Sequence, residues 1–225
     1  MWTKKKSFLL AGIGLAFASL AQNVQPVNLQ CEYLKNPIGL DTSTPRFMWQ
    51  MNDSRNGAFQ AAYQVLVGSD SVKVASGSGE LWDTGKIDGS GRLVNYAGKT
   101  LSPFSKYYWT VVLWDKDQQK TKPSQVASFE TGMMQISNWK GEWISDSKDI
   151  SLKPAPYFRK EFHPSGKVKS ARLYIAAAGL YELSINGKRV GNHRLDPMYT
   201  RFDRRTLYVT YDVTSMVNTS DVVLG

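Results

Sequence analysis

A strand followed by a two-residue turn is the feature that most restricts how this chain of 225 residues can fold. In residues 181–185 apolar side chains alternate with polar ones, which is the period of a strand with one buried face. Asn186-Gly187 follows at once, and these two residue types readily adopt the positive φ angles of a type I′ turn. The segment therefore predicts a β-hairpin and indicates antiparallel β-structure.

Strand signals recur along the rest of the chain, separated by clusters of glycine, asparagine, aspartate and proline, and no helical period is sustained. We predict an all-β chain with two consecutive β-sandwich modules. Residues 24–132 hold about seven short strands, as in an immunoglobulin or fibronectin type III sandwich. Residues 133–143 form a linker. Residues 144–225 show only about four or five of the eight strands of a jelly roll, which predicts an incomplete jelly-roll-like sandwich and a fragment of a longer polypeptide.

The alternating positions also predict individual strands. We expect strands at 27–33, 47–51, 61–67, 81–85, 94–96 and 107–114, with Phe129 closing the first module, and then at 157–162, 171–177, 207–213 and 222–224. The segment 107–114 is apolar on both faces, which indicates a central strand.

The N-terminus has the organisation of a targeting segment. Lys4, Lys5 and Lys6 precede an uncharged apolar run over residues 8–20, and Ser19-Leu20-Ala21 fits a small-x-small cleavage site. We therefore predict a signal peptide over residues 1–21 and export to the periplasm or the extracellular medium. The apolar run is shorter than the ~20 residues that span a bilayer, so we expect no stable membrane anchor.

Cysteine content and charge exclude several classes of protein. Cys31 is the only cysteine, so no internal disulfide can form, and its place on an alternating face predicts a buried small hydrophobic residue rather than a reactive thiol. The formal net charge is +9, and outside Lys4, Lys5 and Lys6 the basic residues are scattered, apart from Arg201, Arg204 and Arg205. No nucleic-acid-binding motif accompanies this charge, so nucleic acid is not an expected partner.

Several motifs occur together in one order. They are 36–41 (NPIGLD), 45–49 (PRFMW), 81–85 (LWDTG), 108–115 (YWTVVLWD), 129–132 (FETG), 139–144 (WKGEWI), 180–191 (LYELSINGKRVG) and 195–200 (LDPMYT). In this arrangement the chain resembles the N-terminal region of bacterial α-L-rhamnosidases of glycoside hydrolase family 78, with a fibronectin type III-like domain and the start of the N-terminal β-sandwich domain.

The resemblance implies that this segment and the catalytic domain of the full-length protein have different roles. The full-length protein would hydrolyse terminal α-L-rhamnose from glycans or glycosides, and its catalytic carboxylates would lie on an α/α barrel beyond Gly225. The expected partners of this segment are then a rhamnosylated glycan or glycoside and the parent's own catalytic barrel. A stand-alone carbohydrate-binding protein and a structural or adhesion β-sandwich protein are the alternative interpretations, because fold alone does not separate them.

The sequence does not indicate catalytic residues of its own. Glycoside hydrolysis needs two carboxylates that flank the scissile bond. The candidates Glu142, Asp146, Glu161, Glu182, Asp196 and Asp203 have no spacing that brings two of them together. We expect each of them to be a solvated or turn residue.

The sequence also predicts no cofactor or metal. His163 and His193 are the only histidines, which makes a zinc site an unfavourable interpretation. Calcium stays open, because it binds loop oxygens such as those of Asn186, Asn192, Asp196 and Asp203. Asn186 and Asp196 already have turn roles that explain their presence.

Aromatic residues indicate where this segment contacts a partner. Tyr181 and Tyr211 lie on alternating apolar faces and are predicted to be core residues. Tyr199 and Phe202 follow Asp196-Pro197 in a loop, and Tyr199, Phe202 and Asp196 are the candidate contacts to carbohydrate or to another domain. Trp139 and Trp143, near the linker, are expected to pack between the modules rather than to stack on sugar.

Overall fold

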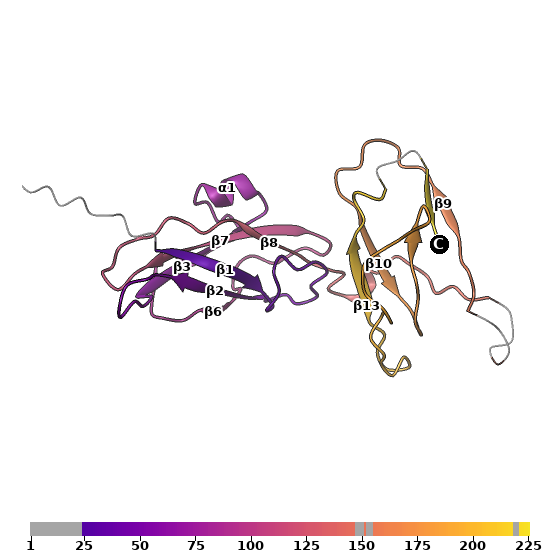
Figure 1. Ribbon diagram of the computed structural model, residues 1–225, viewed down its shortest axis with the longest axis horizontal. Helices are drawn as coiled ribbons and strands as arrows, with labels where there is room; N and C mark the ends of the chain where they lie inside the picture. The colour runs from indigo at the N-terminus through magenta and orange to yellow at the C-terminus, as the bar shows by residue number, and fades with distance from the viewer. Residues whose placement is uncertain (1–23, 147–150, 152–154, 218–220) are drawn as a thin grey trace, which may run out of the picture.

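The computed structural model describes residues 24–146, 151, 155–217 and 221–225. The predicted signal peptide, residues 1–21, lies outside these described residues. Two β modules follow one another along the longest axis of the molecule, as Figure 1 shows. Within the described part of the chain, no helix is both long enough and apolar enough to cross a membrane.

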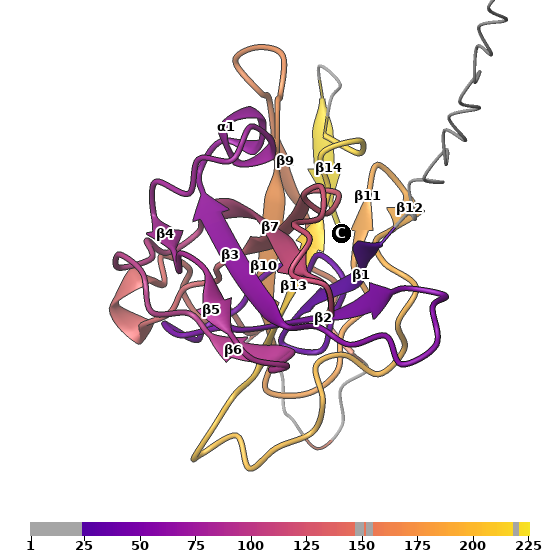
Figure 2. The same cartoon turned by 90° about the vertical axis from the view of Figure 1, so that its left-hand side faces the viewer.

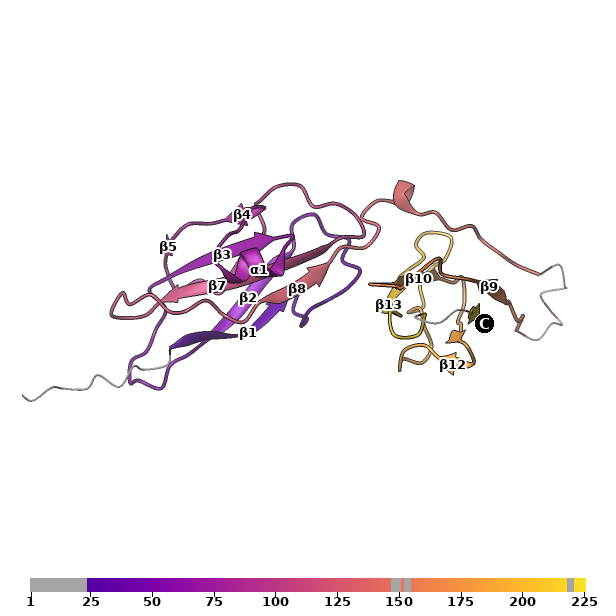
Figure 3. The same ribbon diagram turned by 90° about the horizontal axis from the view of Figure 1, so that it is seen from above.

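The first module is a sandwich of two antiparallel sheets, seen from above in Figure 3. One sheet has the order β1 (Gln25–Cys31), β2 (Arg46–Asn52), β6 (Leu93–Asn95). The other has the order β4 (Trp82–Asp83), β3 (Ala62–Gly68), β7 (Lys106–Trp114), β8 (Ala127–Glu130), and β5 (Ile87–Asp88) also pairs with β3. The predicted immunoglobulin-like sandwich is confirmed, and β7 is the central strand that its two apolar faces predicted.

The core of this sandwich is built from aromatic rings that the alternating pattern places on inward faces. The ring of Phe47 lies 4.5 Å from that of Trp109 and 5.5 Å from that of Phe129, measured between centroids. Cys31 is only 1% exposed, as predicted. Its burial raises the pKa of the thiol to about 12, so the side chain is a protonated, inert part of the core.

One short helix in the first module was not predicted from the sequence. Helix α1 (Ser71–Ala75) begins after Asp70, whose side chain accepts hydrogen bonds from the backbone amides of Val72 and Lys73 at 2.8 and 3.2 Å. Such N-capping satisfies amides that have no partner within the helix. A helix of five residues is too short to show an apolar period, which explains why the pattern did not reveal it.

The second module contains two smaller antiparallel sheets. One pairs β10 (Arg172–Ala176) with β13 (Tyr208–Asp212), and the other has the order β12 (Lys188–Arg189), β11 (Ser184–Ile185), β14 (Val222–Leu224), β9 (Lys160–Phe162). The predicted hairpin is confirmed, since Asn186 and Gly187 have φ angles of 50° and 72° between β11 and β12. An apolar groove of about 520 Å³ opens between the sheets, lined in part by Leu173, Ile185 and Leu224.

The strand predicted at 157–162 is shorter in the structure. It begins only at Lys160, and Tyr157 is completely exposed. In the part of the chain that the structure describes, β9 pairs with β14 alone, over the three positions 222–224, and residues 157–159 are not in a strand.

The two modules are joined by the outer face of the β10–β13 sheet, which lies across the end of the first module (Figure 1). The Tyr208 hydroxyl donates to the Asp41 carboxylate at 2.6 Å and accepts from the Met133 amide at 3.2 Å. Two glycines permit this close approach. A Cβ atom at Gly132 would lie 2.0 Å from the Tyr208 hydroxyl, and one at Gly39 would lie 2.3 Å from the side-chain oxygen of Thr210.

A bidentate ion pair crosses the same interface. Arg172 on β10 donates from Nε and from one terminal nitrogen to the two carboxylate oxygens of Glu130 on β8, each at 2.6 Å. The side chains are 13% and 9% exposed. Burial alone raises the pKa of Glu130, but the hydrogen bonds and charges of Arg172 and Lys106 outweigh it and hold that pKa below its ordinary value.

The two linker tryptophans differ in their surroundings. The ring of Trp139 lies 5.9 Å from that of Tyr208, as expected for packing between modules. The same expectation for Trp143 was wrong, because that residue is 69% exposed. Residues 140–145 are all exposed, so the chain leaves the interface directly after Trp139.

We expect Arg172→Met to lower the free energy of unfolding by about 3 kcal/mol, because the substitution leaves a buried carboxylate without its main counter-charge. Urea denaturation followed by tryptophan fluorescence measures the change. The matched control is Arg159→Met, whose ion pair with Glu161 is exposed on both sides, at 64% and 51%, and which should cost less than about 1 kcal/mol. Equal losses in the two variants would contradict a stabilising role of the module interface.

Candidate functional site

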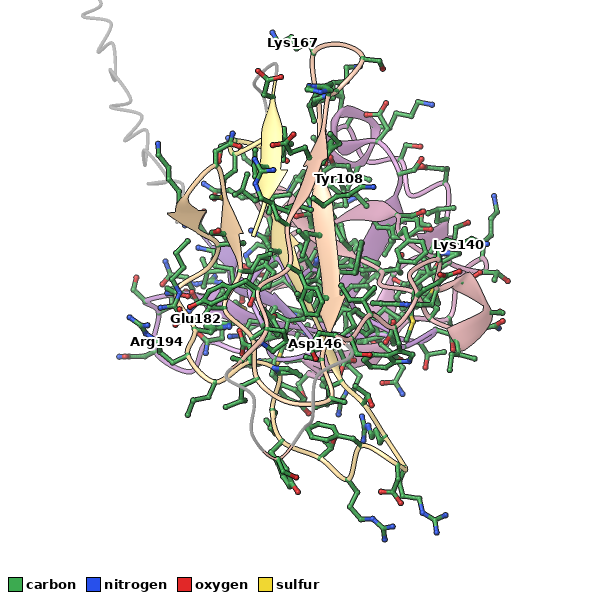
Figure 4. The ribbon with its side chains drawn as sticks, turned by 90° about the vertical axis from the view of Figure 1, so that its right-hand side faces the viewer. Tyr108, Lys140, Asp146, Lys167, Glu182 and Arg194 are labelled. Atoms are coloured by element: carbon green, nitrogen blue, oxygen red, sulfur yellow. The ribbon has the colours of Figure 1, made fainter. Side chains whose placement is uncertain are left out.

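The candidate site is the connection between β12 and β13, residues 195–206, which we call the 195–206 loop. Figures 2 and 4 show this gold segment projecting away from both sheets of the second module. Its large apolar side chains face solvent, with Leu195, Met198 and Tyr199 exposed at 73%, 74% and 79%. The rings of Tyr199 and Phe202 meet edge to face, with centroids 5.4 Å apart, so Phe202 supports Tyr199 from one side.

Asp196 fastens the base of this loop to the module. Its backbone carbonyl accepts from the Tyr181 amide at 3.0 Å, and its carboxylate accepts from the Tyr211 hydroxyl at 2.7 Å. The hydroxyls of Tyr181 and Tyr211 lie 2.9 Å apart. Both tyrosines pack against the second core, as predicted. Burial raises the pKa of each phenol, and the hydrogen bond to Tyr211 adds to this shift for Tyr181, as the bond to Asp196 does for Tyr211, so both groups stay protonated.

The tip of the loop is a compact turn that carries three arginines. The amides of Arg204 and Arg205 both donate to the carbonyl of Arg201 at 2.8 Å, and the hydroxyl of Thr200 donates to the carbonyl of Arg205. Asp203 is the one acidic residue of the tip, and its carboxylate binds Arg201, with a 3.0 Å hydrogen bond from Nε. The tip therefore has an excess of positive charge beside the exposed ring of Tyr199.

The three residues named from the sequence thus occupy different positions. Tyr199 and Phe202 form one ring pair on the exposed loop, and their contact with a partner stays a prediction. Asp196 is a half-buried anchor, with a side chain that is 18% exposed, so its first role is to hold the loop. The sequence did not reveal that anchor, because the hydroxyl that binds the carboxylate belongs to Tyr211, which lies 15 positions further along the chain.

The other candidate carboxylates have separate partners. Glu161 binds Arg159, Glu182 binds Arg194 at 3.3 Å, and Asp203 binds Arg201. Figure 4 shows Glu182 and Arg194 together on the surface of the second module. Glu142 is exposed and Asp146 is half-buried.

The residues considered for calcium also serve the fold. The Asn186 amide donates to the carbonyl of Asp221 at 3.1 Å and accepts from the amide of Val223 at 2.8 Å, which ties the hairpin to β14. In the part of the chain that the structure describes, no three His, Cys, Asp or Glu side chains are grouped so that they could hold a metal ion.

Comparison with known proteins identifies both modules. Residues 26–135 match the family described as Rha78A-like, N-terminal immunoglobulin domain. Residues 166–225 match the family described as Alpha-L-rhamnosidase N-terminal domain. The chain belongs to the α-L-rhamnosidase family, and its two modules are N-terminal domains of that family. The resemblance of the sequence motifs to these enzymes is thereby confirmed.

Individual relatives agree with this assignment. An α-L-rhamnosidase of Formosa agariphila is 32% identical in an alignment 213 positions long, which covers 84% of this chain and 22% of the relative. One of Alteromonas sp. (strain LOR) is 32% identical in an alignment 238 positions long, gaps included, which covers 98% of this chain and 26% of the relative. A solved structure of the α-L-rhamnosidase of Dictyoglumus thermophilum superposes with a TM-score of 0.83 at 39% identity, covering 89% of this chain and 24% of that one. The chain thus spans about a quarter of the length of these α-L-rhamnosidases.

We expect Tyr211→Phe to lower the free energy of unfolding by about 1–2 kcal/mol, because it removes the hydroxyl that satisfies the half-buried Asp196 carboxylate. Thermal and urea unfolding measure the change. Tyr157→Phe is the matched control, since Tyr157 is 100% exposed and the loss of its hydroxyl should change stability by less than about 0.5 kcal/mol. A Tyr211→Phe variant as stable as the parent would mean that Asp196 does not anchor the loop.

Proposed function

We propose that this chain is the non-catalytic N-terminal portion of an exported α-L-rhamnosidase, which hydrolyses terminal α-L-rhamnose from glycans or glycosides. The main support for this proposal is that two consecutive modules match, in order, the N-terminal domains of that family. The relatives are about four times as long, since this chain covers 22% and 26% of them, which leaves the larger part of each for a catalytic domain.

The state of the buried carboxyl groups supports a non-catalytic role. A glycosidase acid keeps its proton because its pKa is raised. Burial raises the pKa of Asp115 and of Glu130, yet hydrogen bonds from backbone amides and arginines in the first case, and the pairing with Arg172 and Lys106 in the second, bring both below the ordinary value. These carboxyl groups are ionised partners of arginine, which is a structural role.

The accessory role that we propose is positional. The interface around Glu130 and Tyr208 couples the two modules, and the anchor at Asp196 fixes the 195–206 loop to the second one. A loop held in this way could either contact the glycan or pack on the catalytic barrel of the same polypeptide. The exposed Tyr199–Phe202 pair also favours a second candidate function, that of a stand-alone carbohydrate-binding module.

We expect the purified chain to show no turnover of an aryl α-L-rhamnoside under conditions in which the full-length enzyme is active, because the residues that the structure describes offer no acid and base that flank a common site. Release of the aryl group, followed by absorbance, measures the activity. Turnover by the chain that Glu182→Gln or Asp203→Asn abolishes would place an active site here and overturn the proposal.

We also expect the mature protein to begin at Gln22 and to be found outside the cytoplasm, because Lys4, Lys5 and Lys6 precede an apolar run that ends in a cleavage motif. Sequencing the N-terminus of the protein from its natural host measures the cleavage position. A retained Met1 in the exported fraction would contradict the prediction of a cleaved signal peptide.

A further inference from the structure

The tip of the 195–206 loop brings an exposed aromatic ring and several exposed arginines together in one short segment. Within seven positions it carries the exposed ring of Tyr199 and the arginines Arg201, Arg204 and Arg205. We call these four residues, with the supporting Phe202, the arginine–tyrosine patch. Exposed apolar residues rimmed by charge mark interaction sites more often than solitary exposed residues do.

Among the residues that the structure describes, the arginines of this patch outnumber the carboxylates beside them. By contrast, Arg55 forms ion pairs with three aspartates, and Arg172 binds Glu130 and Asp212. At the loop tip, one carboxylate, that of Asp203, binds Arg201 closely and lies 3.8 Å from Arg204. A net positive charge therefore remains at an exposed position, where it attracts anions.

The aromatic part of the patch is available on one face. The rings of Phe202 and Tyr199 meet edge to face, and Tyr199 is 79% exposed. A tyrosine ring held in this way presents a flat apolar surface with a polar tip, which suits the apolar C–H face of a pyranose ring. A guanidinium group beside it binds a carboxylate or sulfate oxygen pair through parallel hydrogen bonds.

The patch is also held in place before any ligand binds. Two backbone hydrogen bonds to the Arg201 carbonyl close the turn, and the Asp196–Tyr211 contact fixes the base. Binding to an ordered loop avoids much of the entropy cost of ordering it, so a small patch can support measurable affinity.

We propose that the arginine–tyrosine patch binds an anionic oligosaccharide, with a pyranose face on Tyr199 and a carboxylate or sulfate group on Arg204 and Arg205. The inference rests on the proposed accessory role of the chain and specifies the class of glycan that this role concerns. A neutral sugar offers no anionic group for the arginines to bind. Packing against another domain would require carboxylates of that domain to neutralise the surplus positive charge.

The test uses isothermal titration calorimetry of the chain with an oligogalacturonate, with a neutral maltooligosaccharide of equal length and with single-stranded DNA as a general polyanion. We expect the oligogalacturonate to bind and to weaken with added salt, because exposed charges are screened. We expect at least about tenfold weaker binding of the neutral oligosaccharide and of DNA. Equal binding of either one would overturn the proposal.

Two variants locate the site. Tyr199→Ala and the double variant Arg204→Gln/Arg205→Gln should each weaken oligogalacturonate binding by about tenfold or more, with unchanged circular dichroism and melting temperature. The matched control is Lys167→Gln/Lys169→Gln, which removes two exposed charges and should leave binding within about twofold. Figure 4 shows Lys167 at the end of the module opposite to the 195–206 loop. Parental affinity in the patch variants, or an equal loss in the lysine control, would overturn the proposal.

The same variants in the full-length enzyme separate this inference from the proposed function. Hydrolysis of a neutral aryl rhamnoside reports the proposed function, whereas oligogalacturonate binding reports the patch. If Tyr199→Ala instead destabilises the full-length enzyme and leaves oligogalacturonate binding unchanged, the patch packs on another domain and the proposal of a glycan site is wrong.

Discussion

The relation between the two modules depends on one buried ion pair. Its carboxylate lies on the last strand of the first module, and its guanidinium lies on the first strand of the sheet that joins the modules. Glu130 and Arg172 share two hydrogen bonds of 2.6 Å, while Asp212 on β13 binds the same guanidinium at 2.9 Å. Neither charge could stay buried alone, because desolvation would cost several kcal/mol. The pair therefore favours one docked arrangement over a flexible connection.

The β10–β13 sheet can serve both modules because the side chains of a strand alternate between its two faces. Leu173 and Tyr211, which are paired across the sheet, face the second core, whereas Arg172 and Tyr208 face the first module. In sequence, the second set has the appearance of an ordinary solvated face. Its actual environment is set by Gly39, Gly132 and Glu130, and no local pattern connects those distant positions with this sheet.

The sequence therefore predicted the features that local periodicity and turn residues determine. The central strand β7, the hairpin at Asn186-Gly187 and the burial of Cys31 all follow from alternation and turn chemistry. The prediction from sequence failed where a residue's environment depends on tertiary partners. Residues 157–159 are not paired in the described structure, and Trp143 lies beyond the contact that Trp139 makes. The roles of Glu130 and Asp196 depend on hydrogen-bond donors that are distant in the sequence.

Strand β13 connects the candidate site with the module interface. Tyr208 on one of its faces binds Asp41 of the first module, and Tyr211 on the other binds Asp196 at the base of the 195–206 loop. A strand paired with β10 over five positions is stiff, so the loop base and the interface cannot move independently. The base of the loop is consequently held relative to the first module as well as to its own. An accessory segment that presents a loop to a partner needs this restricted movement. A patch on a freely rotating module would bind more weakly, because binding would also have to order the module.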